Sequence, residues 1–396
     1  MTHIFVNALA ASAGGGLTYV RNLVRQVARR DDIEATFLLS QNFLQELNYA
    51  ANIRFIKRHV PSVAWRFWRE QRDIPQLIRE AGATVLLSTG NFALWNSPVP
   101  QILLSRNALY TSEDFLRDLQ RRRDYRLWVD NQFKAMVARK SIQRVECTVA
   151  PTESFAASLR EWSGRNVVSI HHGFDHDAFA GDGGPLPEPL RVKLAPTEGS
   201  VKLLFVSHYN YYRNFETLLR ALAMVKHRVA PRTVRLILTC HLRSNSKARG
   251  YRTDRVASLV GELGLESDII ELGAVPYNQL HHVYRSCDIY VTPAYAESFG
   301  HPLVEAMASG LPIVASDLAV HREICGSASV YFPRFSPLAL AECIDGILEN
   351  PNAAESMKEQ GLRRARAFSW SDHVENLLTL ARKLTGNAAC IQAPLH

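Results

Sequence analysis

The chain has 396 residues, of which 47% are hydrophobic and 21% are charged. This composition excludes a disordered or fibrous protein, and the length exceeds what one ordinary hydrophobic core accommodates, so we expect two globular domains. The net charge of +8 is concentrated in the first 180 residues, which contain 23 Lys and Arg against 17 Asp and Glu. A basic surplus of this kind can meet a phosphate-bearing ligand, an anionic membrane or a nucleic acid, and by itself it does not choose among them.

The cysteines indicate a reducing compartment. Six are scattered along the chain, at 147, 240, 287, 325, 343 and 390, and none forms a C-x-x-C pair. We therefore expect buried thiols and a cytoplasmic protein, in place of a disulfide framework or a zinc site. Residues 8–13 lack the basic start and long apolar run of a signal peptide, and no segment has the character of a transmembrane helix.

A strand is predicted over residues 3–8 and a helix from Leu17 to Val27, where apolar residues recur at helical spacing. Between them lies a run of three glycines, 14–16. Glycines allow a backbone to approach a ligand closely, but such a run is equally typical of a flexible turn.

Residues 65–74 mix aromatic and basic side chains, namely Trp65, Phe67 and Trp68 among Arg66, Arg69 and Arg72. Such a mixture can lie on a membrane surface, but we favour a helix that packs on the sheet with its Arg stems along the edge. Strands are predicted at 84–88 and 101–105, and Arg106 with Asn107 follows the second of them.

Residues 113–140 are charged, helical in pattern, and include Arg121-Arg122-Arg123. Charged runs are usually solvated faces, with membrane or nucleic-acid contact as the alternative. Strands at 147–150 and 167–170 follow, with a helix from Glu153 between them. The later triplet 175–177, Asp-His-Asp, could hold a divalent metal beside a diphosphate, but the triplet is common and we interpret it as a loop.

Pro and Gly accumulate at 181–200, which we predict to be an interdomain linker. Strands and helices then alternate again, at 203–206, 215–227, 234–239, 253–263 and 269–272. This alternation predicts a second Rossmann-like α/β domain. We expect domains at 1–180 and 201–368, followed by a C-terminal segment at 369–396.

The most informative stretch is 288–317. Residues 289–291 form a buried-type strand, and Gly300-His301-Pro302 opens a helix after it. Pro302 suits the first helical turn and Gly300 permits a tight turn before it. The free N–H groups and the positive end of the helix dipole then form a site for an anion such as a diphosphate.

Two carboxylates bracket this turn, Glu297 before it and Glu305 one turn into the helix, with seven residues between them. Carboxylates accept hydrogen bonds from hydroxyl groups. The pair therefore predicts polyols on either side of the phosphates, a ribose on one side and a sugar on the other.

The pattern E-S-F-G-H-P-L-V-E resembles the E-x7-E signature of retaining family-4 glycosyltransferases, and its flanking residues also fit: Asp288, Pro293, Gly310 and Pro312. The resemblance implies a GT-B fold, in which the parallel sheets of two Rossmann-like domains face each other across a cleft. The segment from Phe368-Ser369-Trp370 to Leu384 resembles the family's C-terminal helix, which crosses back to the first domain. The implied enzyme is a metal-independent hexosyltransferase that moves a sugar from a nucleoside-diphosphate sugar to an acceptor hydroxyl with retention of anomeric configuration.

The resemblance also implies roles for individual residues. Glu297 holds the hydroxyls of the donor sugar, Glu305 holds the ribose, and the backbone of Phe299, Gly300 and His301 contacts sugar and phosphate. The glycines Gly14, Gly15 and Gly16 border the cleft near the phosphates and the acceptor, and the loop at Val275 reads the nucleotide base through its backbone.

Two positions depart from the family pattern. The family usually has Gly-Arg and then Lys at the two cation positions that neutralise the diphosphate; here Arg213 fits the second and His208 replaces the first. An imidazole is mostly neutral near pH 7, so we expect leaving-group stabilisation to depend mainly on Arg213. Many relatives carry a His-Asp pair at Arg106-Asn107. Arg106 could instead bind an anionic acceptor group, bind the donor phosphates, or pair with a neighbouring carboxylate.

The expected partners are a nucleotide-sugar donor and a glycan or lipid-linked acceptor in cell-surface polysaccharide or glycolipid synthesis, with peripheral contact to the anionic inner face of a membrane. No metal, other cofactor or nucleic acid is expected. Two alternatives stay open. A nucleotide-sugar epimerase of the same fold would need no acceptor. A basic nucleic-acid or membrane-binding protein with an inactive cleft would account for the departures at His208 and Arg106.

Overall fold

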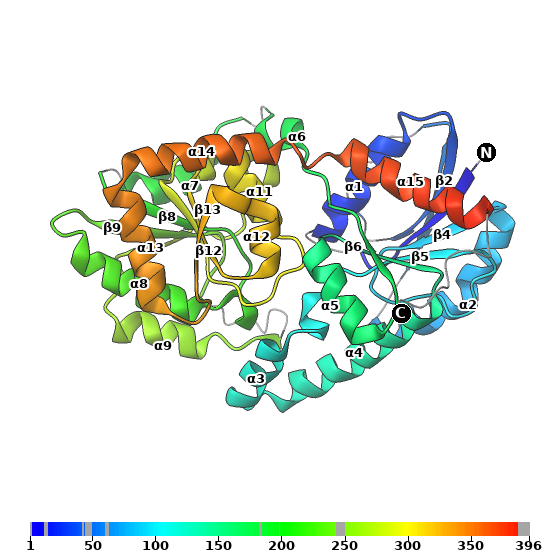
Figure 1. The fold of residues 1–396 in the computed structure, drawn as a ribbon, viewed down its shortest axis with the longest axis horizontal. Coiled ribbons are helices and arrows are strands. Elements are labelled where there is room, and N and C mark those ends of the chain that lie inside the picture. Colours follow the sequence, from blue (N-terminus) through cyan, green and yellow to red (C-terminus); the bar gives the residue numbers. More distant parts are fainter. Residues whose placement is uncertain are drawn as a thin grey trace. The chain divides into compact units, whose positions relative to one another are not determined.

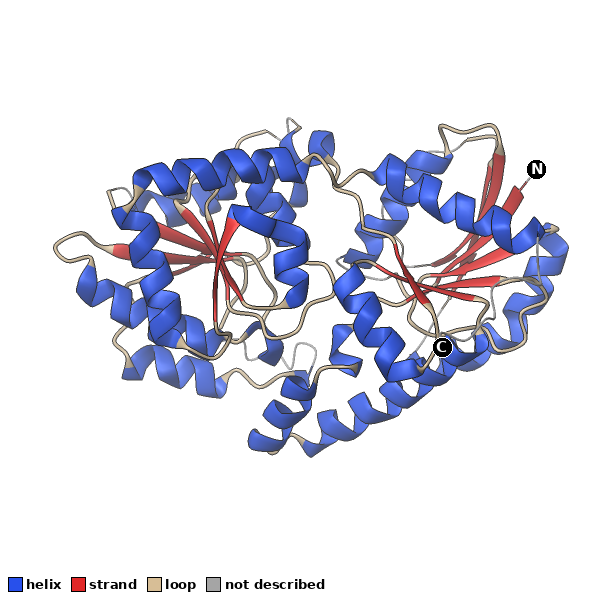
Figure 2. Ribbon diagram, in the orientation of Figure 1, coloured by secondary structure: helices blue, strands red, loops and turns tan. Residues whose placement is uncertain are grey.

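The computed structural model describes residues 2–11, 15–41, 43, 50–59, 63–181, 184–197, 199–242 and 250–386. The chain divides into two compact units. The N-terminal unit consists of Met1–Thr111, Val129–Gly173 and Ser369–His396, and the C-terminal unit of Ser112–Trp128 and Phe174–Phe368. Both are α/β units, in which helices lie on both faces of a parallel sheet (Figure 2).

The N-terminal unit contains a seven-stranded parallel sheet of order β3-β2-β1-β4-β5-β6-β7. Its strands are β1 (Thr2–Ala8), β2 (Ile33–Ser40), β3 (Ile53–Arg58), β4 (Val85–Ser88), β5 (Gln101–Leu104), β6 (Cys147–Ala150) and β7 (Val167–Ser169). The helices of this unit include α1 (Gly15–Val27), α2 (Val63–Ala81), α5 (Glu153–Ser163) and α15 (Trp370–Gly386). The strand order reverses between β1 and β4, and ligands of open α/β sheets bind at the carboxyl ends of strands beside such a reversal.

The C-terminal unit contains a six-stranded parallel sheet of order β10-β9-β8-β11-β12-β13. Its strands are β8 (Val201–Phe205), β9 (Val234–Leu238), β10 (Ile269–Glu271), β11 (Ile289–Thr292), β12 (Ile313–Ser316) and β13 (Ser329–Phe332). Its helices include α8 (Phe215–Arg228), α9 (Asp254–Glu262), α10 (Leu280–Arg285), α11 (His301–Ala308), α12 (Ala319–Cys325), α13 (Pro337–Glu349) and α14 (Pro351–Ala365). Here the reversal lies between β8 and β11, so the loops that follow these two strands meet at one edge of the sheet.

The C-terminal helix α15 belongs to the N-terminal unit, as the family resemblance implied (Figure 1). It contributes Val374, Leu377 and Leu378 to the same hydrophobic core as Val20 and Leu23 of α1. The chain therefore completes the core of its first unit with its last helix.

Several predicted elements take a different form. The helical stretch 113–140 is two helices, α3 (Glu113–Arg121) and α4 (Tyr125–Arg144), because the backbone turns at Arg123 with a φ of +53°. Residues 181–200, predicted as a linker, contain α7 (Glu188–Leu194) and group with the C-terminal unit. The loop interpretation of 175–177 is wrong, because Asp175 accepts a hydrogen bond from Ala178 N at 3.0 Å and caps helix α6 (His176–Ala180).

The cysteines of the described residues are free thiols; Cys147, Cys240, Cys287 and Cys325 are buried and Cys343 is partly buried. Cys390 lies outside the described residues. Among the helices that the structure describes, none combines the length and the hydropathy needed to cross a membrane.

Candidate active site

The turn between β11 and α11 has the geometry that its sequence predicts. Gly300 precedes the first residue of α11 and adopts the left-handed conformation, with a φ of +88°. The turn favours glycine because of this backbone conformation, and a Cβ here would lie 2.9 Å from Leu303 Cδ1, so the leucine side chain would have to shift as well. The first N–H groups of α11 are thereby presented at the carboxyl end of the sheet.

The structure joins two of the predicted site residues directly. Arg213 Nη1 donates to Glu297 Oε2 at 2.5 Å. Arg213 lies in a short 3₁₀ turn after β8, where Asn210 Oδ1 accepts from the Arg213 backbone N at 3.1 Å, and Glu297 lies in the loop after β11. Because β8 and β11 are neighbours in the sheet, residues 84 positions apart in sequence meet at its carboxyl edge.

The environment keeps this pair ionised. Burial opposes ionisation of Glu297, but the guanidinium of Arg213 and the nearby His321 outweigh it, so that the pKa of Glu297 is lowered. Burial also opposes the charge of Arg213, and the carboxylate of Glu297 more than offsets it and raises the pKa of Arg213. The Nε of Arg213 is buried and has no hydrogen-bond partner among the described residues. The Arg213 side chain as a whole is 17% exposed, so part of the cation is accessible at this edge of the sheet.

Glu305 lies one turn into α11 and is buried. Its Oε2 accepts a hydrogen bond from Tyr284 OH of α10 at 2.8 Å. Burial raises the pKa of Glu305 to about 7, and the hydrogen bond from Tyr284 opposes this shift. Tyr284 was not identified from the sequence, because no local pattern indicates that α10 packs beside α11.

The other predicted site residues of the C-terminal unit differ in how deeply they are buried. Phe299 is buried, with its ring 4.8 Å from that of His301 and 5.6 Å from that of Phe368. His208 is exposed in the loop after β8. Val275 is half-buried in the loop after β10, close in sequence to Gly273, whose φ is +77° and where a Cβ would lie 2.6 Å from His241 Nε2.

In the N-terminal unit, Gly15 and Gly16 are the first residues of α1, and Gly14 lies outside the described residues. Arg106 follows β5. Its Nη2 donates to the Thr89 carbonyl oxygen at 2.7 Å, and its guanidinium lies 4.9 Å from the centre of the Tyr19 ring. Burial lowers the pKa of Arg106.

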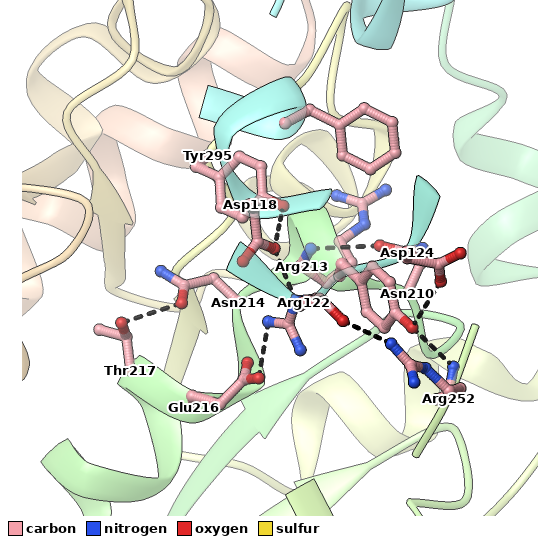
Figure 3. Close-up of polar contacts among 12 residues, drawn as sticks. Asp118, Arg122, Asp124, Asn210, Arg213, Asn214, Glu216, Thr217, Arg252 and Tyr295 are labelled. Atoms are coloured by element: carbon pink, nitrogen blue, oxygen red, sulfur yellow. Dashed lines mark hydrogen bonds and ion pairs between the residues drawn. The ribbon is translucent and has the colours of Figure 1, made fainter. Parts of the chain in front are cut away.

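Helix α3 belongs to the C-terminal unit and is held to the rest of that unit by ion pairs (Figure 3). Arg122, directly after α3, lies between two carboxylates, with Nε 2.9 Å from Asp118 Oδ2 and Nη2 2.6 Å from Glu216 Oε1. The prediction of a solvated face is correct for Arg121 and Arg123, which are exposed, and wrong for Arg122, whose side chain is 9% exposed. Sequence alone cannot distinguish the three, because the distinction depends on Glu216 of α8.

The same contacts support the two loops that carry Arg213 and Glu297. Tyr295, two residues before Glu297, donates from its hydroxyl to Asp118 Oδ2 at 2.7 Å. The guanidinium of Arg122 lies 4.2 Å from the centre of the Tyr211 ring, two residues before Arg213. We refer to Asp118, Arg122, Tyr211, Glu216 and Tyr295 as the α3 cluster. The donor-side loops are thus positioned in part by a segment from the first half of the sequence.

Among the side chains that the structure describes, no group of three or more His, Cys, Asp or Glu residues is placed to hold a metal ion.

Two parallel-sheet α/β units, the second followed by a helix that returns to the first, define the GT-B class of fold. Solved structures of this class superimpose along nearly the whole chain. Sucrose-phosphate synthase from Thermosynechococcus elongatus matches with a TM-score of 0.75 and 19% identity, covering 97% of this chain and 99% of that one. HepE from Anabaena, solved in complex with UDP, matches with a TM-score of 0.70 and 16% identity, covering 97% and 100%.

Sequence comparison identifies the family. The model described as Glycosyltransferase Family 4 matches residues 13–178, and the model described as Glycosyl transferases group 1 matches residues 188–364. Together the two models cover most of the chain, which belongs to glycosyltransferase family 4. A phosphatidyl-myo-inositol mannosyltransferase of Mycobacterium tuberculosis is 29% identical over 245 residues, 59% of each chain. Other relatives are matched over about half of their own length.

Proposed function

We propose that this protein transfers a sugar from a nucleoside-diphosphate sugar to an acceptor hydroxyl, with retention of anomeric configuration and without a metal ion. The observation that carries the proposal is the Arg213–Glu297 ion pair at the carboxyl edge of β8 and β11. It places a cation and an ionised carboxylate beside the glycine-capped start of α11. Glu305 lies one turn further along that helix.

In this arrangement each charged group has a separate task. Arg213 and the first N–H groups of α11 bind the diphosphate, because both present positive charge to one point. Glu297 accepts hydrogen bonds from the sugar hydroxyls, and Glu305 from the ribose hydroxyls. Beside this core, we propose backbone contacts from Phe299, Gly300, His301 and Val275.

We assign supporting roles to the remaining predicted residues. His208 supplements Arg213 at the diphosphate when it is protonated. In the N-terminal unit, Gly15 and Gly16 allow close approach at the start of α1, and Arg106 binds an anionic group of the acceptor or the donor.

The transfer itself breaks the bond between the anomeric carbon and the diphosphate oxygen and forms a bond to the acceptor oxygen on the same face of the sugar. The departing phosphate oxygen takes the proton of the acceptor hydroxyl, so charge and atoms balance without a protein nucleophile. The negative charge that develops on the leaving diphosphate is stabilised by Arg213 and the start of α11, which are already in position.

The acceptor we propose is a glycan or a lipid-linked molecule in cell-surface polysaccharide or glycolipid synthesis, reached from the cytoplasm by peripheral contact with an anionic membrane. Two observations support this choice. The mycobacterial relative acts, by its name, on a phosphatidylinositol. The basic surplus lies in the first 180 residues, which supply most of the N-terminal unit.

Thermal stabilisation by UDP, GDP, ADP and dTDP, each with magnesium or with EDTA, tests the donor site. One diphosphate should raise the melting temperature equally in both conditions, since a ligand bound only by the folded state stabilises it by mass action. Glu305→Gln should weaken that stabilisation. Glu297→Gln should retain it, and should slow sugar transfer about 10- to 100-fold through the loss of charged hydrogen bonds to the sugar.

Glu359→Gln is the matched control, because Glu359 is an exposed carboxylate paired with Arg363 on α14. This variant should change neither the thermal stabilisation by the nucleoside diphosphate nor the rate of sugar transfer. Stabilisation that requires magnesium would contradict the metal-independent mechanism. Donor turnover that is unaffected in Glu297→Gln, with the fold intact, would contradict the assignment of the site.

A further inference from the structure

His241 is an accessible imidazole at the carboxyl edge of the C-terminal sheet. It lies three residues beyond the end of β9, and its side chain is 53% exposed. An exposed side chain without contacts keeps its rotamer freedom. The ring of His241 is instead fixed at two points by residues at the end of the neighbouring strand, β10.

The first contact is with Glu271, the last residue of β10. Nδ1 of His241 lies 3.1 Å from Glu271 Oε2, and the other carboxylate oxygen accepts a hydrogen bond from the Leu242 backbone N at 3.0 Å. A carboxylate can only accept hydrogen bonds, so Nδ1 carries the proton and donates it. One carboxylate thus fixes both the loop after β9 and the imidazole that extends from this loop.

The second contact is with Gly273, whose φ is +77°. Because Gly273 has no side chain, the imidazole can lie directly against its backbone. A Cβ at this position would be 2.6 Å from His241 Nε2 and 3.3 Å from Cε1, so an alanine would displace the ring. Both ring nitrogens are therefore directed at protein atoms, and the accessible surface of the imidazole is mainly its flat face.

The loops that follow β8, β9 and β10 lie side by side, because these strands are neighbours in the sheet (β8 and β9 in Figure 1). Thr239 Oγ1 accepts a hydrogen bond from the Ser207 backbone N at 3.0 Å, which joins the loop after β9 to the loop that carries Arg213. Neighbouring strands are about 4.8 Å apart, so the loops after β8 and β10 are separated by about 10 Å. A ribose with its phosphate spans a distance of this order.

Helix α10 gives a second link between these loops and the donor site. It follows the loop 272–276, and its Tyr284 donates a hydrogen bond to Glu305 at 2.8 Å. Glu305 is the residue that we propose for the ribose. A nucleotide with its diphosphate at Arg213 and its ribose at Glu305 therefore presents its base toward the loops after β9 and β10.

We propose that the imidazole of His241 is a stacking platform for the base of the nucleoside diphosphate. The inference rests on the proposed function for the class of ligand, and it deepens that function by assigning a side chain to the base. Because Glu271 and Gly273 already fix the ring, base binding does not have to order it. Every nucleobase has a π-face, so such a platform accepts purines and pyrimidines alike. The choice between them is then left to the backbone of the loop at Val275.

Titration calorimetry tests the platform with two ligands. One is whichever of UDP, GDP, ADP and dTDP stabilises the wild-type protein most, and the other is inorganic pyrophosphate, which has no base. His241→Ala should weaken binding of the nucleoside diphosphate about tenfold, the effect expected from the loss of one stacked base, and should leave binding of pyrophosphate unchanged. His241→Phe should retain most of the affinity, because a phenyl ring supplies the same flat face.

His227→Ala is the matched control, because it removes an exposed histidine in the last turn of α8. This variant should bind both ligands as the wild-type protein does. Proton NMR adds a direct signature of stacking. The Hε1 signal of His241, identified by its absence from His241→Ala, should move upfield with the nucleoside diphosphate and not with pyrophosphate, because the ring current of a stacked base shields that proton.

Wild-type affinity for the nucleoside diphosphate in His241→Ala would overturn the stacking role and leave the proposed function intact. Equal losses in His241→Ala and His241→Phe would also overturn it, and would assign to His241 a hydrogen bond to the base instead. Weaker pyrophosphate binding in His241→Ala would place the effect at the diphosphate and contradict the inference. If no nucleoside diphosphate bound the wild-type protein, the proposed function itself would fail, and this inference with it.

Discussion

Nucleotide-sugar binding should weaken as the pH falls below 7, because the ionised carboxylate of Glu305 accepts hydrogen bonds from the ribose hydroxyls more strongly than the protonated carboxyl does. In the free protein, burial raises the pKa of Glu305 to about 7. Hydrogen bonds from a ribose favour the carboxylate, so the bound state has a lower pKa and binding releases a proton below pH 7. The ionised fraction is about one tenth at pH 6 and about nine tenths at pH 8, which predicts roughly tenfold tighter binding at pH 8.

Titration calorimetry at pH 6, 7 and 8 measures this effect directly. An intact nucleotide sugar is the appropriate ligand, because a terminal phosphate would itself titrate near pH 6. Running each titration in two buffers of different ionisation enthalpy gives the number of protons released. At pH 6 the value should approach one, and at pH 8 it should approach zero.

Two variants identify the titrating group. Glu305→Gln should bind more weakly at pH 8 and lose the pH dependence, since the amide carries no proton to release. Tyr284→Phe removes the hydrogen bond that favours the carboxylate, so the pKa of Glu305 should rise further and the midpoint should move to higher pH. A tenfold pH dependence that persists in Glu305→Gln would refute the reasoning and assign the proton to another group, with exposed His208 the first to examine.

Two further predictions concern stability. Arg122→Met should destabilise the C-terminal unit by about 3–5 kcal/mol in urea unfolding, because it leaves Glu216 buried without its cation. Adding Glu216→Gln to this variant should recover part of the lost stability. The control Arg117→Met removes an exposed ion pair with Glu113 on the same helix, and it should cost under about 1 kcal/mol. Equal losses in the two Arg variants would contradict the role of the α3 cluster. Glu70→Gln should remove a pH dependence of stability, because burial raises the pKa of Glu70 from 4.5 to about 7, against the opposing effects of Arg66 and Asn7. The neutral form therefore stabilises the protein fully below pH 4.5, and about 3 kcal/mol of that contribution is lost as the pH rises through 7. Melting curves between pH 5 and 8 should show a smaller pH effect in Glu70→Gln, and parallel curves for the two proteins would contradict the assignment.

The family and the local form of the donor loop were predictable from sequence. Gly300 and Pro302 mark the start of α11 because they act on the backbone of their own turn, whatever surrounds it. The buried strand at 289–291 is recognisable for a similar reason, since a short run of β-branched and aromatic residues is typical of an inner parallel strand. The positions of Glu297 and Glu305 on either side of that turn were predictable for the same reason, because both residues lie in one short segment of the sequence.

The partners of these residues were not predictable. The pairing of Arg213 with Glu297 depends on β8 and β11 being neighbours in the sheet, and the hydrogen bond from Tyr284 to Glu305 depends on how α10 packs beside α11. Each of these contacts joins residues that are distant in sequence and that carry no pattern in common.

In two segments, tertiary structure alone decided which side chains are buried. The three consecutive arginines 121–123 look alike in sequence, and only Arg122 enters an ion pair with Glu216. In α4, Phe133 and Met136 are exposed, whereas Ala135 and Ala138 pack against Tyr110. Sequence determined the elements and the motif through interactions between near neighbours. The fold decided burial, pairing and exposure, because these depend on which distant segments the sheets bring together.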